Sequence, residues 1–504
     1  MSSRSLTIMI AAFLLIPIQI RGVQRAELPA QDRFEMARAA WDAGDFITAL
    51  EELESLLREG PDLELQDRIA LLTGELFSVS ELTADGQRVR WSPDGRYLAY
   101  ESGASGELLT HILGMETSGA REVAAVSGGS LVFAPAKDQA AYLKVQETAD
   151  LREARNSLQS EFGGTDRASR NRLRAELARL DQENSVVVVQ DLASGQERTF
   201  QPEGFRLAGL FYGPGSVLHL LGGPVEGDGQ AGIYRIGDDD KVTPLVEGVA
   251  ASDPVFAAGG ELLVFGTGRS SFSVLRVGTG GIQDFQGSAP VLSADGRSLA
   301  YLSAGASGPT LNLLTLGTEI QSTAMELPYP VSTSSTRACP SCPLQSGLSL
   351  SPDGRFAIVQ ARPREDWELF QVSLDGPSDS PPVRQVTREI QHDLYPTVLP
   401  DGRLLAMKGE GRHRRSHLYD LDTGEKIWLF RNNTVRTVAP EYEWAPSPDG
   451  SKLLIVAERD GNTVSPERGV YLMDLSRTVG REDHMARDQT NLPAERDHRA
   501  CLLY

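Results

Sequence analysis

The stretch Trp91-Ser92-Pro93-Asp94-Gly95-Arg96 has the residue types of a tight reverse turn between two strands. Proline fixes φ at the first corner, the aspartate side chain hydrogen-bonds its own backbone, and glycine takes the position that requires a positive φ. The apolar residues Tyr97-Leu98-Ala99-Tyr100 come directly after it and predict the second strand of a hairpin. One such turn indicates a hairpin, and its repetition along the chain indicates the fold.

The turn recurs at intervals from this point to the end of the apolar part of the chain. Four further copies keep the aspartate and the glycine: Leu292-Ser293-Ala294-Asp295-Gly296, Leu350-Ser351-Pro352-Asp353-Gly354, Leu399-Pro400-Asp401-Gly402 and Ser447-Pro448-Asp449-Gly450. Three degenerate copies fit the same register: Phe133-Ala134-Pro135, Phe211-Tyr212-Gly213-Pro214-Gly215 and Phe256-Ala257-Ala258-Gly259-Gly260. Together these make eight repeats, the pattern of a repeat architecture.

Each repeat also contains a second pair of strands. Val186-Val187-Val188-Val189 precedes Asp191-x-x-x-Gly195, and His417-Leu418-Tyr419 precedes Asp420-x-x-x-Gly424, so a second reversal follows the third strand. A unit of this kind is a four-stranded antiparallel meander, and such units arranged radially form a β-propeller. The sequence therefore predicts a mainly β fold, an eight-bladed propeller over residues 78–476.

The Ser-Pro-Asp-Gly form of the repeat resembles the TolB-like, WD-like propeller family. It is also similar to the propellers of prolyl-oligopeptidase-type and dipeptidyl-peptidase-type enzymes. The resemblance spans about residues 78–476 and implies the propeller fold, whereas a fold of this kind hosts many unrelated functions.

The last repeat has only three recognisable strands, within Ala445–Ser476. A free strand, Phe77–Thr83, stands just before the first repeat. Because a ring of blades must not leave sheet edges open, we expect this strand to close the last blade.

Residues 30–77 predict a small α-helical module before the propeller. Apolar residues at helical spacing form two amphipathic helices with Gly44 at their turn and Pro61 as a stop. The pattern Gly44-Asp45-Phe46, with a small residue at Ala49, resembles a tetratricopeptide repeat, although Arg33 holds that family's early Trp position. A plain helical hairpin that shields the edge of the propeller is the alternative.

Export is expected from residues 1–26, where an apolar run behind Arg4 is too short to span a bilayer and is typical of a signal peptide. Whether this segment is cleaved or kept as an anchor stays open. The protein is then periplasmic or secreted, from a bacterium, and not an integral membrane protein.

Its 504 residues carry a net charge of −20, which excludes nucleic acid as a partner because phosphates would be repelled. Residues 477–504 form a polar tail.

The topology of a four-stranded blade predicts where partners bind. Tight turns emerge at one end of the strands, the tight-turn face, and the longer loops and blade-to-blade connections emerge at the other, the loop face. Binding usually occurs on long loops of a rigid scaffold. The longest insert, residues 146–185, predicts a helical hairpin on the loop face. By strand counting, the N-terminal helices lie on the tight-turn face.

One locally basic cluster projects toward the loop face: Arg412, His413, Arg414, Arg415 and His417. It is the candidate partner-binding loop, and a solvated loop without a ligand is the alternative. The two histidines do not have the spacing of a metal site.

Cys339 and Cys342 enclose Pro340-Ser341 in a predicted loop. A redox-active pair, half of a zinc site and a static disulfide all fit this spacing, and a static disulfide fits an exported loop best. Cys501 is left over.

No catalytic motif is recognisable. Gly-x-Ser-x-Gly and His-Glu-x-x-His are absent, and the sequence shows no clear convergence of His, Asp or Arg in the central channel. No cofactor or metal is expected. We therefore expect an exported, non-catalytic scaffold that binds a protein or peptide of the cell envelope through the loop face. The alternative is an accessory or truncated propeller of a peptidase system, which binds or gates peptides for a hydrolase on another chain.

Overall fold

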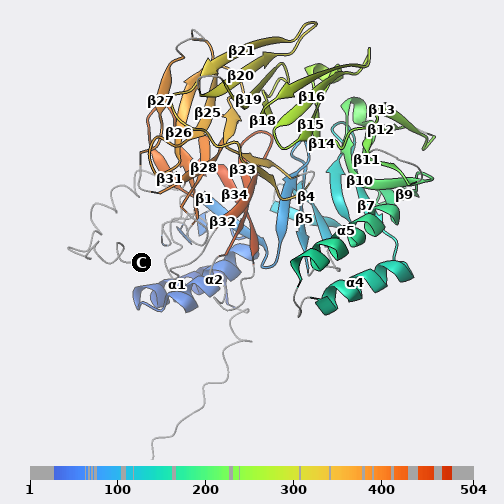
Figure 1. The fold of residues 1–504 in the computed structure, drawn as a ribbon. Coiled ribbons are helices and arrows are strands. Elements are labelled where there is room, and N and C mark those ends of the chain that lie inside the picture. The colour runs from blue at the N-terminus through green and yellow to red at the C-terminus, as the bar shows by residue number, and fades with distance from the viewer. Residues whose placement is uncertain are drawn as a thin grey trace, which may run out of the picture.

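The computed structural model shows eight four-stranded antiparallel sheets arranged as the blades of a β-propeller (Figure 1). All eight turns found in the sequence join the first and second strands of a blade. The structure describes residues 28–62, 64–65, 68–69, 72, 77–103, 109–116, 119–161, 166–225, 231–237, 239–305, 308–339, 342–376, 381–388, 391–409, 414–429, 441–458 and 468–478. The expected signal peptide, the polar tail beyond residue 478 and Cys501 lie outside these residues.

The four strands of each blade follow one another from the channel outward. Blade 1 is β2 (Gln87–Trp91), β3 (Tyr97–Ser102), β4 (Leu109–Glu116) and β5 (Gly119–Ser127); blade 2 is β6 (Gly129–Phe133), β7 (Gln139–Val145), β8 (Ser185–Asp191) and β9 (Glu197–Phe200); blade 3 is β10 (Phe205–Tyr212), β11 (Leu218–Pro224), β12 (Gly232–Ile236) and β13 (Val242–Val246); blade 4 is β14 (Ser252–Ala257), β15 (Leu262–Gly268), β16 (Ser271–Arg276) and β17 (Gly281–Gln286). Blade 5 is β18 (Ser288–Leu292), β19 (Ser298–Ala304), β20 (Pro309–Thr315) and β21 (Gln321–Glu326); blade 6 is β24 (Leu348–Leu350), β25 (Phe356–Ala361), β26 (Glu368–Ser373) and β27 (Val383–Gln385); blade 7 is β28 (Asp393–Val398), β29 (Leu404–Lys408), β30 (Arg415–Tyr419) and β31 (Lys426–Trp428); blade 8 is β32 (Glu441–Pro446), β33 (Lys452–Ala457), β34 (Gly469–Thr478) and β1 (Phe77–Thr83).

Side-chain hydrogen bonds close the repeated turns. The Ser92 hydroxyl donates to Asp94 Oδ1 at 2.6 Å and accepts the backbone N–H of Tyr97 at 2.9 Å. Gly95 has a φ of +71°, a conformation that glycine adopts without steric cost. The same bonds recur in the turns that begin at Ser293, Ser351 and Ser447. Six consecutive residues therefore suffice to reverse the chain.

A buried apolar cluster lies at each of the eight interfaces between neighbouring blades. Strand β33 shows how one strand serves two interfaces. Its side chains alternate, so Leu453 and Ile455 face blade 7 while Leu454 and Val456 face blade 1. Both faces of a blade are covered by its neighbours, which explains why a second strand such as β33 is apolar without interruption from Leu453 to Ala457.

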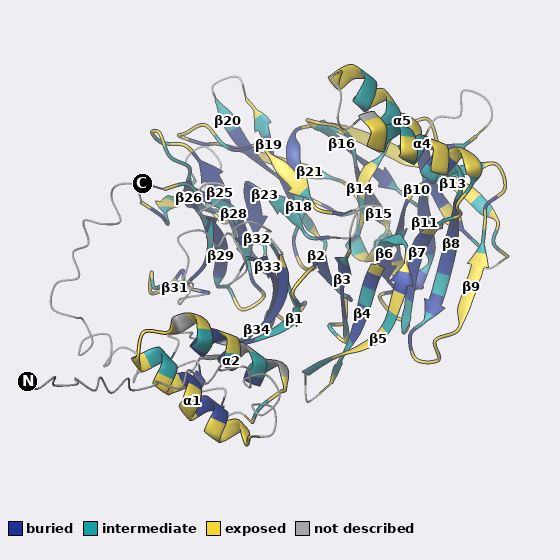
Figure 2. Cartoon of the chain, turned by 90° about the horizontal axis from the view of Figure 1, so that it is seen from below, coloured by how far each residue is buried: buried dark blue, intermediate teal, exposed yellow. Residues whose placement is uncertain are grey.

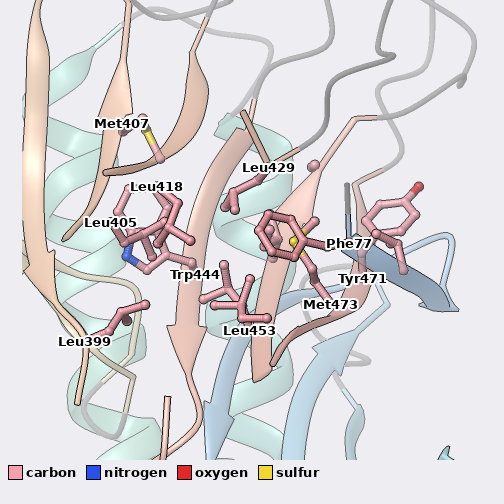
Figure 3. Close-up of a cluster of buried hydrophobic side chains, with 14 residues drawn as sticks. Phe77, Leu399, Leu405, Met407, Leu418, Leu429, Trp444, Leu453, Tyr471 and Met473 are labelled. Carbon is pink, nitrogen blue, oxygen red and sulfur yellow. The ribbon is translucent and has the colours of Figure 1, made fainter. Parts of the chain in front are cut away.

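Strand β1 closes the ring, as predicted. It pairs antiparallel with β34, so the last blade takes three strands from the C-terminal part of the chain and one from the N-terminal part. Phe77, 1% exposed, packs in the cluster that contains Trp444 and Met473 (Figure 3). The N-terminal strand thereby covers an edge that would otherwise be open.

Helices α1 (Ala30–Asp42) and α2 (Phe46–Arg58) precede β1 and have an apolar core of their own, which includes Phe34 and Leu53. Arg33 is nearly buried between them. Its guanidinium contacts Glu52 at 2.5 Å and Glu59 at 2.7 Å and donates to the Ser55 hydroxyl at 2.9 Å. These bonds accommodate a charged residue between the two helices.

The helices lie at opposite ends of the strands. Figure 2 shows α1 and α2 at one end and α4 (Ala149–Glu161) and α5 (Arg167–Glu183) at the other. β1 starts at the tight-turn face, so the helices before it lie there, as predicted, whereas α4 and α5 join the second and third strands of blade 2 on the loop face. α5 packs against β10 of blade 3. Among the described residues, no helix is long and apolar enough to span a bilayer.

Candidate functional site

The innermost strands begin at the loop face, around the mouth of the central channel. In five blades the strand has an irregular register near its start, with a non-glycine residue at positive φ: Arg88, Ser130, Asp253, Ala289 and Tyr395. Bulges of this kind redirect a side chain away from the regular alternation of a strand. The position holds a small residue in blades 2 and 5, but a long or charged one in blades 1, 4 and 7.

A two-stranded hairpin crosses the channel mouth. It consists of β22 (Ser335–Arg337) and β23 (Leu344–Ser346), in the connection between blades 5 and 6, and β23 lies between β18 and β28 in Figure 2. Arg337 forms an ion pair of 3.1 Å with Asp253 of blade 4. At the tip, Cys339 Sγ accepts a hydrogen bond of 2.9 Å from Arg90 of blade 1. Because blades 1 and 5 are opposite in a ring of eight, the hairpin spans the channel.

Cys339 and Cys342 form a disulfide at this tip, with an S–S distance of 2.12 Å. Both cysteines are buried. Burial shields the bond from other thiols, and a static role for the disulfide stays a prediction. The bond braces the turn that rests on Arg90.

A cavity of about 370 Å³ opens between the hairpin and the inner strands of blades 1, 7 and 8. Its size falls within the usual range of ligand pockets, about 300–1,000 Å³. Its wall is made of arginines, aromatic residues, one carboxylate and the inner side of the hairpin: Gln87, Arg88, Thr336, Ala338, Pro343, Gln345, Tyr395, Arg414, Tyr442, Glu443, Trp444 and Arg468.

A buried charge network supports the blade 1 wall. Glu101, 1% exposed, accepts hydrogen bonds from Arg88 at 2.8 Å and from Arg90 at 3.1 Å. Glu443 accepts the backbone N–H of Arg88 at 2.5 Å, and its burial raises the pKa of its carboxyl. Burial lowers the pKa of Arg90, although Glu101 opposes this effect. The wall is therefore held in place by paired charges.

Two arginines of the lining lie against aromatic rings. The Arg468 guanidinium carbon is 3.7 Å from the centre of the Tyr442 ring, and that of Arg414 is 5.9 Å from the centre of the Tyr395 ring. The Tyr442 hydroxyl in turn donates to Glu458. Stacking occupies the face of a guanidinium and leaves its N–H groups at the edge for an oxygen ligand.

The basic cluster predicted from the sequence is divided by the structure. Arg412 and His413 lie outside the described residues, and Arg414 lines the cavity. Arg415 and His417 belong to strand β30, and His417 is 2% exposed, so the predicted loop is too long at its C-terminal end. Burial lowers the pKa of His417 to about 3, so this imidazole is neutral and does not add to a basic surface.

The convergence of charge at the channel mouth was not recognised in the sequence. Arg88 comes from the first repeat and Glu443 and Arg468 from two parts of the last, and the three residues have no shared local motif. The one signal was alternation in β2, where Arg88 and Arg90 flank the buried Val89. Within the described part of the chain, no three His, Cys, Asp or Glu side chains gather as a metal ion would require.

No protein-family model and no curated protein matches the chain. Among solved structures, it is similar to oligogalacturonate lyase from Vibrio parahaemolyticus, with 11% identity, a TM-score of 0.43, and coverage of 79% of this chain and 93% of that one. It is similar to the β-propeller domain of the Trilobed protease from Pyrococcus furiosus, with 10% identity, a TM-score of 0.39 and coverage of 77% and 95%. For TolB from Acinetobacter baumannii the values are 14%, 0.31, 58% and 77%. At these identities the likeness is one of fold alone: the chain shares the β-propeller architecture with these proteins.

Proposed function

We propose that the chain is an exported, non-catalytic scaffold that binds a protein or peptide of the cell envelope at the loop-face cavity. The observation that carries the proposal is the composition of the cavity wall, where Arg88, Arg414 and Arg468 alternate with Tyr395, Tyr442 and Trp444. Arginine, tyrosine and tryptophan are the residues that contribute most to binding energy in protein interfaces.

The lining supports binding rather than catalysis. The described residues of the wall include no histidine, cysteine or serine, so they form neither a Ser–His nor a Cys–His pair. Export is supported by the apolar segment before residue 26 and by the disulfide, since disulfides persist in oxidising compartments. The helices α1 and α2 on the opposite face then remain available for a second contact.

Peptide enrichment tests this function. Peptides from a digested envelope extract are incubated with the purified chain, and the bound fraction is identified by mass spectrometry. We expect a subset of peptides to be enriched at unchanged mass. Thr336→Trp, which places a large side chain in the cavity from the hairpin, should reduce this enrichment at least about tenfold, because the ligand loses the space it occupies.

Thr243→Trp is the matched control, since Thr243 is an exposed threonine on β13 away from the cavity. It should leave the enrichment unchanged. Enrichment that survives Thr336→Trp would place binding elsewhere. New fragments of the peptides that form only with the chain present would contradict a non-catalytic role.

A further inference from the structure

We propose that the cavity recognises a carboxylate of the bound segment, held by Arg414 and Arg468. The carboxylate is either the C-terminal group of the partner or an aspartate or glutamate side chain. This inference rests on the proposed function and names the chemistry of the ligand.

The balance of charge in the wall is the first argument. Three arginines and one glutamate line the cavity, in a chain whose net charge is −20. A positive pocket within an acidic protein concentrates the field on a small anionic group, while the acidic surroundings repel an extended polyanion. A single carboxylate on a peptide fits both conditions.

The pairing of these charges is the second argument. Arg88 forms an ion pair of 2.8 Å with Glu101, which is buried behind the wall. Glu443 accepts the N–H of Arg88, and among the described residues no ion pair joins it to Arg414 or Arg468. The positive charges of Arg414 and Arg468 are therefore available to a ligand.

The surroundings of Arg414 are the third argument. Its Nε is buried, and no acceptor for it is found among the described residues. Its main-chain carbonyl accepts the backbone N–H of Glu441 at 3.2 Å and Arg415 Nη1 at 2.9 Å, so the backbone of Arg414 is fixed where β30 begins. A guanidinium on a fixed backbone beside Tyr395 is well placed for the paired N–H···O bonds that carboxylates form with arginine.

The aromatic residues indicate what accompanies the carboxylate. Tyr395, Tyr442 and Trp444 line the same cavity, and aromatic rings bury apolar groups while directing polar groups to their edges. A peptide end or a loop with one acidic residue next to apolar residues matches this wall.

The test uses the most enriched peptide of the preceding experiment, synthesised in three forms. The first has its natural C-terminal and side-chain carboxylates, the second has a C-terminal amide, and the third also has Asn or Gln in place of Asp or Glu. We expect the dissociation constant, measured by calorimetry, to rise about tenfold or more when the recognised carboxylate is removed. The form at which it rises identifies the source of the carboxylate.

Variants of the chain, measured with both the natural and the uncharged peptide, test the arginine side of the same interaction. Arg414→Gln should weaken binding of the natural peptide about tenfold and leave binding of the uncharged peptide unchanged. Arg414→Lys should have an intermediate effect, because it keeps the charge but not the paired geometry, and it serves if the glutamine variant fails to fold. Arg297→Gln, at an exposed arginine on the tight-turn face, is the control.

A change of less than twofold on removing every carboxylate, or an equal effect of Arg297→Gln, would overturn the inference while the proposed function stands. If no peptide is enriched, or if enrichment does not depend on the cavity, the proposed function fails and this inference fails with it.

Discussion

Replacing Phe77 by alanine is expected to lower the free energy of unfolding by about 3–5 kcal/mol, the usual cost of removing a buried aromatic ring. Phe77 is 1% exposed and packs with Trp444 and Met473 in the blade that joins the two ends of the chain. Its removal leaves a cavity at the one place where the ring is closed by strand pairing between the N-terminal and C-terminal parts. Urea unfolding followed by circular dichroism measures the loss.

Ile282→Ala is the matched control. Ile282 is 49% exposed on the outer strand β17, so its truncation should change the free energy of unfolding by no more than about 0.5 kcal/mol. If Phe77→Ala cost as little as this control, β1 would not close the last blade.

The second large effect is expected at Asp393, a buried carboxyl at the interface between blades 6 and 7, and concerns the pH dependence of the free energy of unfolding. Asp393 starts β28 and is fully buried. Its Oδ1 accepts the Tyr419 hydroxyl at 3.1 Å, while Oδ2 is buried without a hydrogen-bond partner among the described residues. Burial raises the pKa of Asp393 to about 6, and the negative charge of Glu368 adds to the rise. The nearby Thr387 hydroxyl donates to Glu368 Oε2 at 2.5 Å.

The sign of the pH dependence follows from this shift. The pKa of Asp393 is above its value of 3.8 in the unfolded chain, so the folded protein holds this proton more tightly. Its contribution to the free energy of unfolding is fully present below about pH 4 and is lost as the pH rises toward 6. The loss is about 3 kcal/mol, from 1.36 kcal/mol for each unit of pKa.

Asp393→Asn should remove this dependence, because the amide stays neutral. The stability of the variant relative to the wild type should therefore be about 2 kcal/mol more favourable at pH 8 than at pH 4, measured by urea unfolding at both values. Asp422→Asn, at an exposed aspartate of the same blade, should show no such change between the two pH values. A constant difference between Asp393→Asn and the wild type would show that the pKa of Asp393 is the same in the folded and the unfolded chain.

The repeat and its topology were predictable because their chemistry is local. In the turn at Ser92, every bond that reverses the chain joins residues within six positions, so the residue types in the text specify the structure. The closing role of β1 followed from counting strands, since three in the last repeat require a fourth. Neither inference needed knowledge of a distant contact.

The cavity was not predictable in this way, because its wall joins residues that are far apart in the sequence. Cys339 contacts Arg90 over a separation of 249 residues, and Glu443 contacts Arg88 over 355. The segment with the cysteines was expected to be a loop, whereas it forms a hairpin across the channel. Of the described members of the basic cluster, Arg414, Arg415 and His417, only Arg414 lines the cavity, because β30 begins at the next residue.

Hydrogen exchange of the chain with and without the most enriched peptide shows whether the peptide binds at the loop-face cavity. We predict slower exchange in residues 335–346, the hairpin that forms one wall, and unchanged exchange in the tight turns at 92–96 and 351–355. Exchange that slows at the tight turns and stays the same in the hairpin would contradict the account.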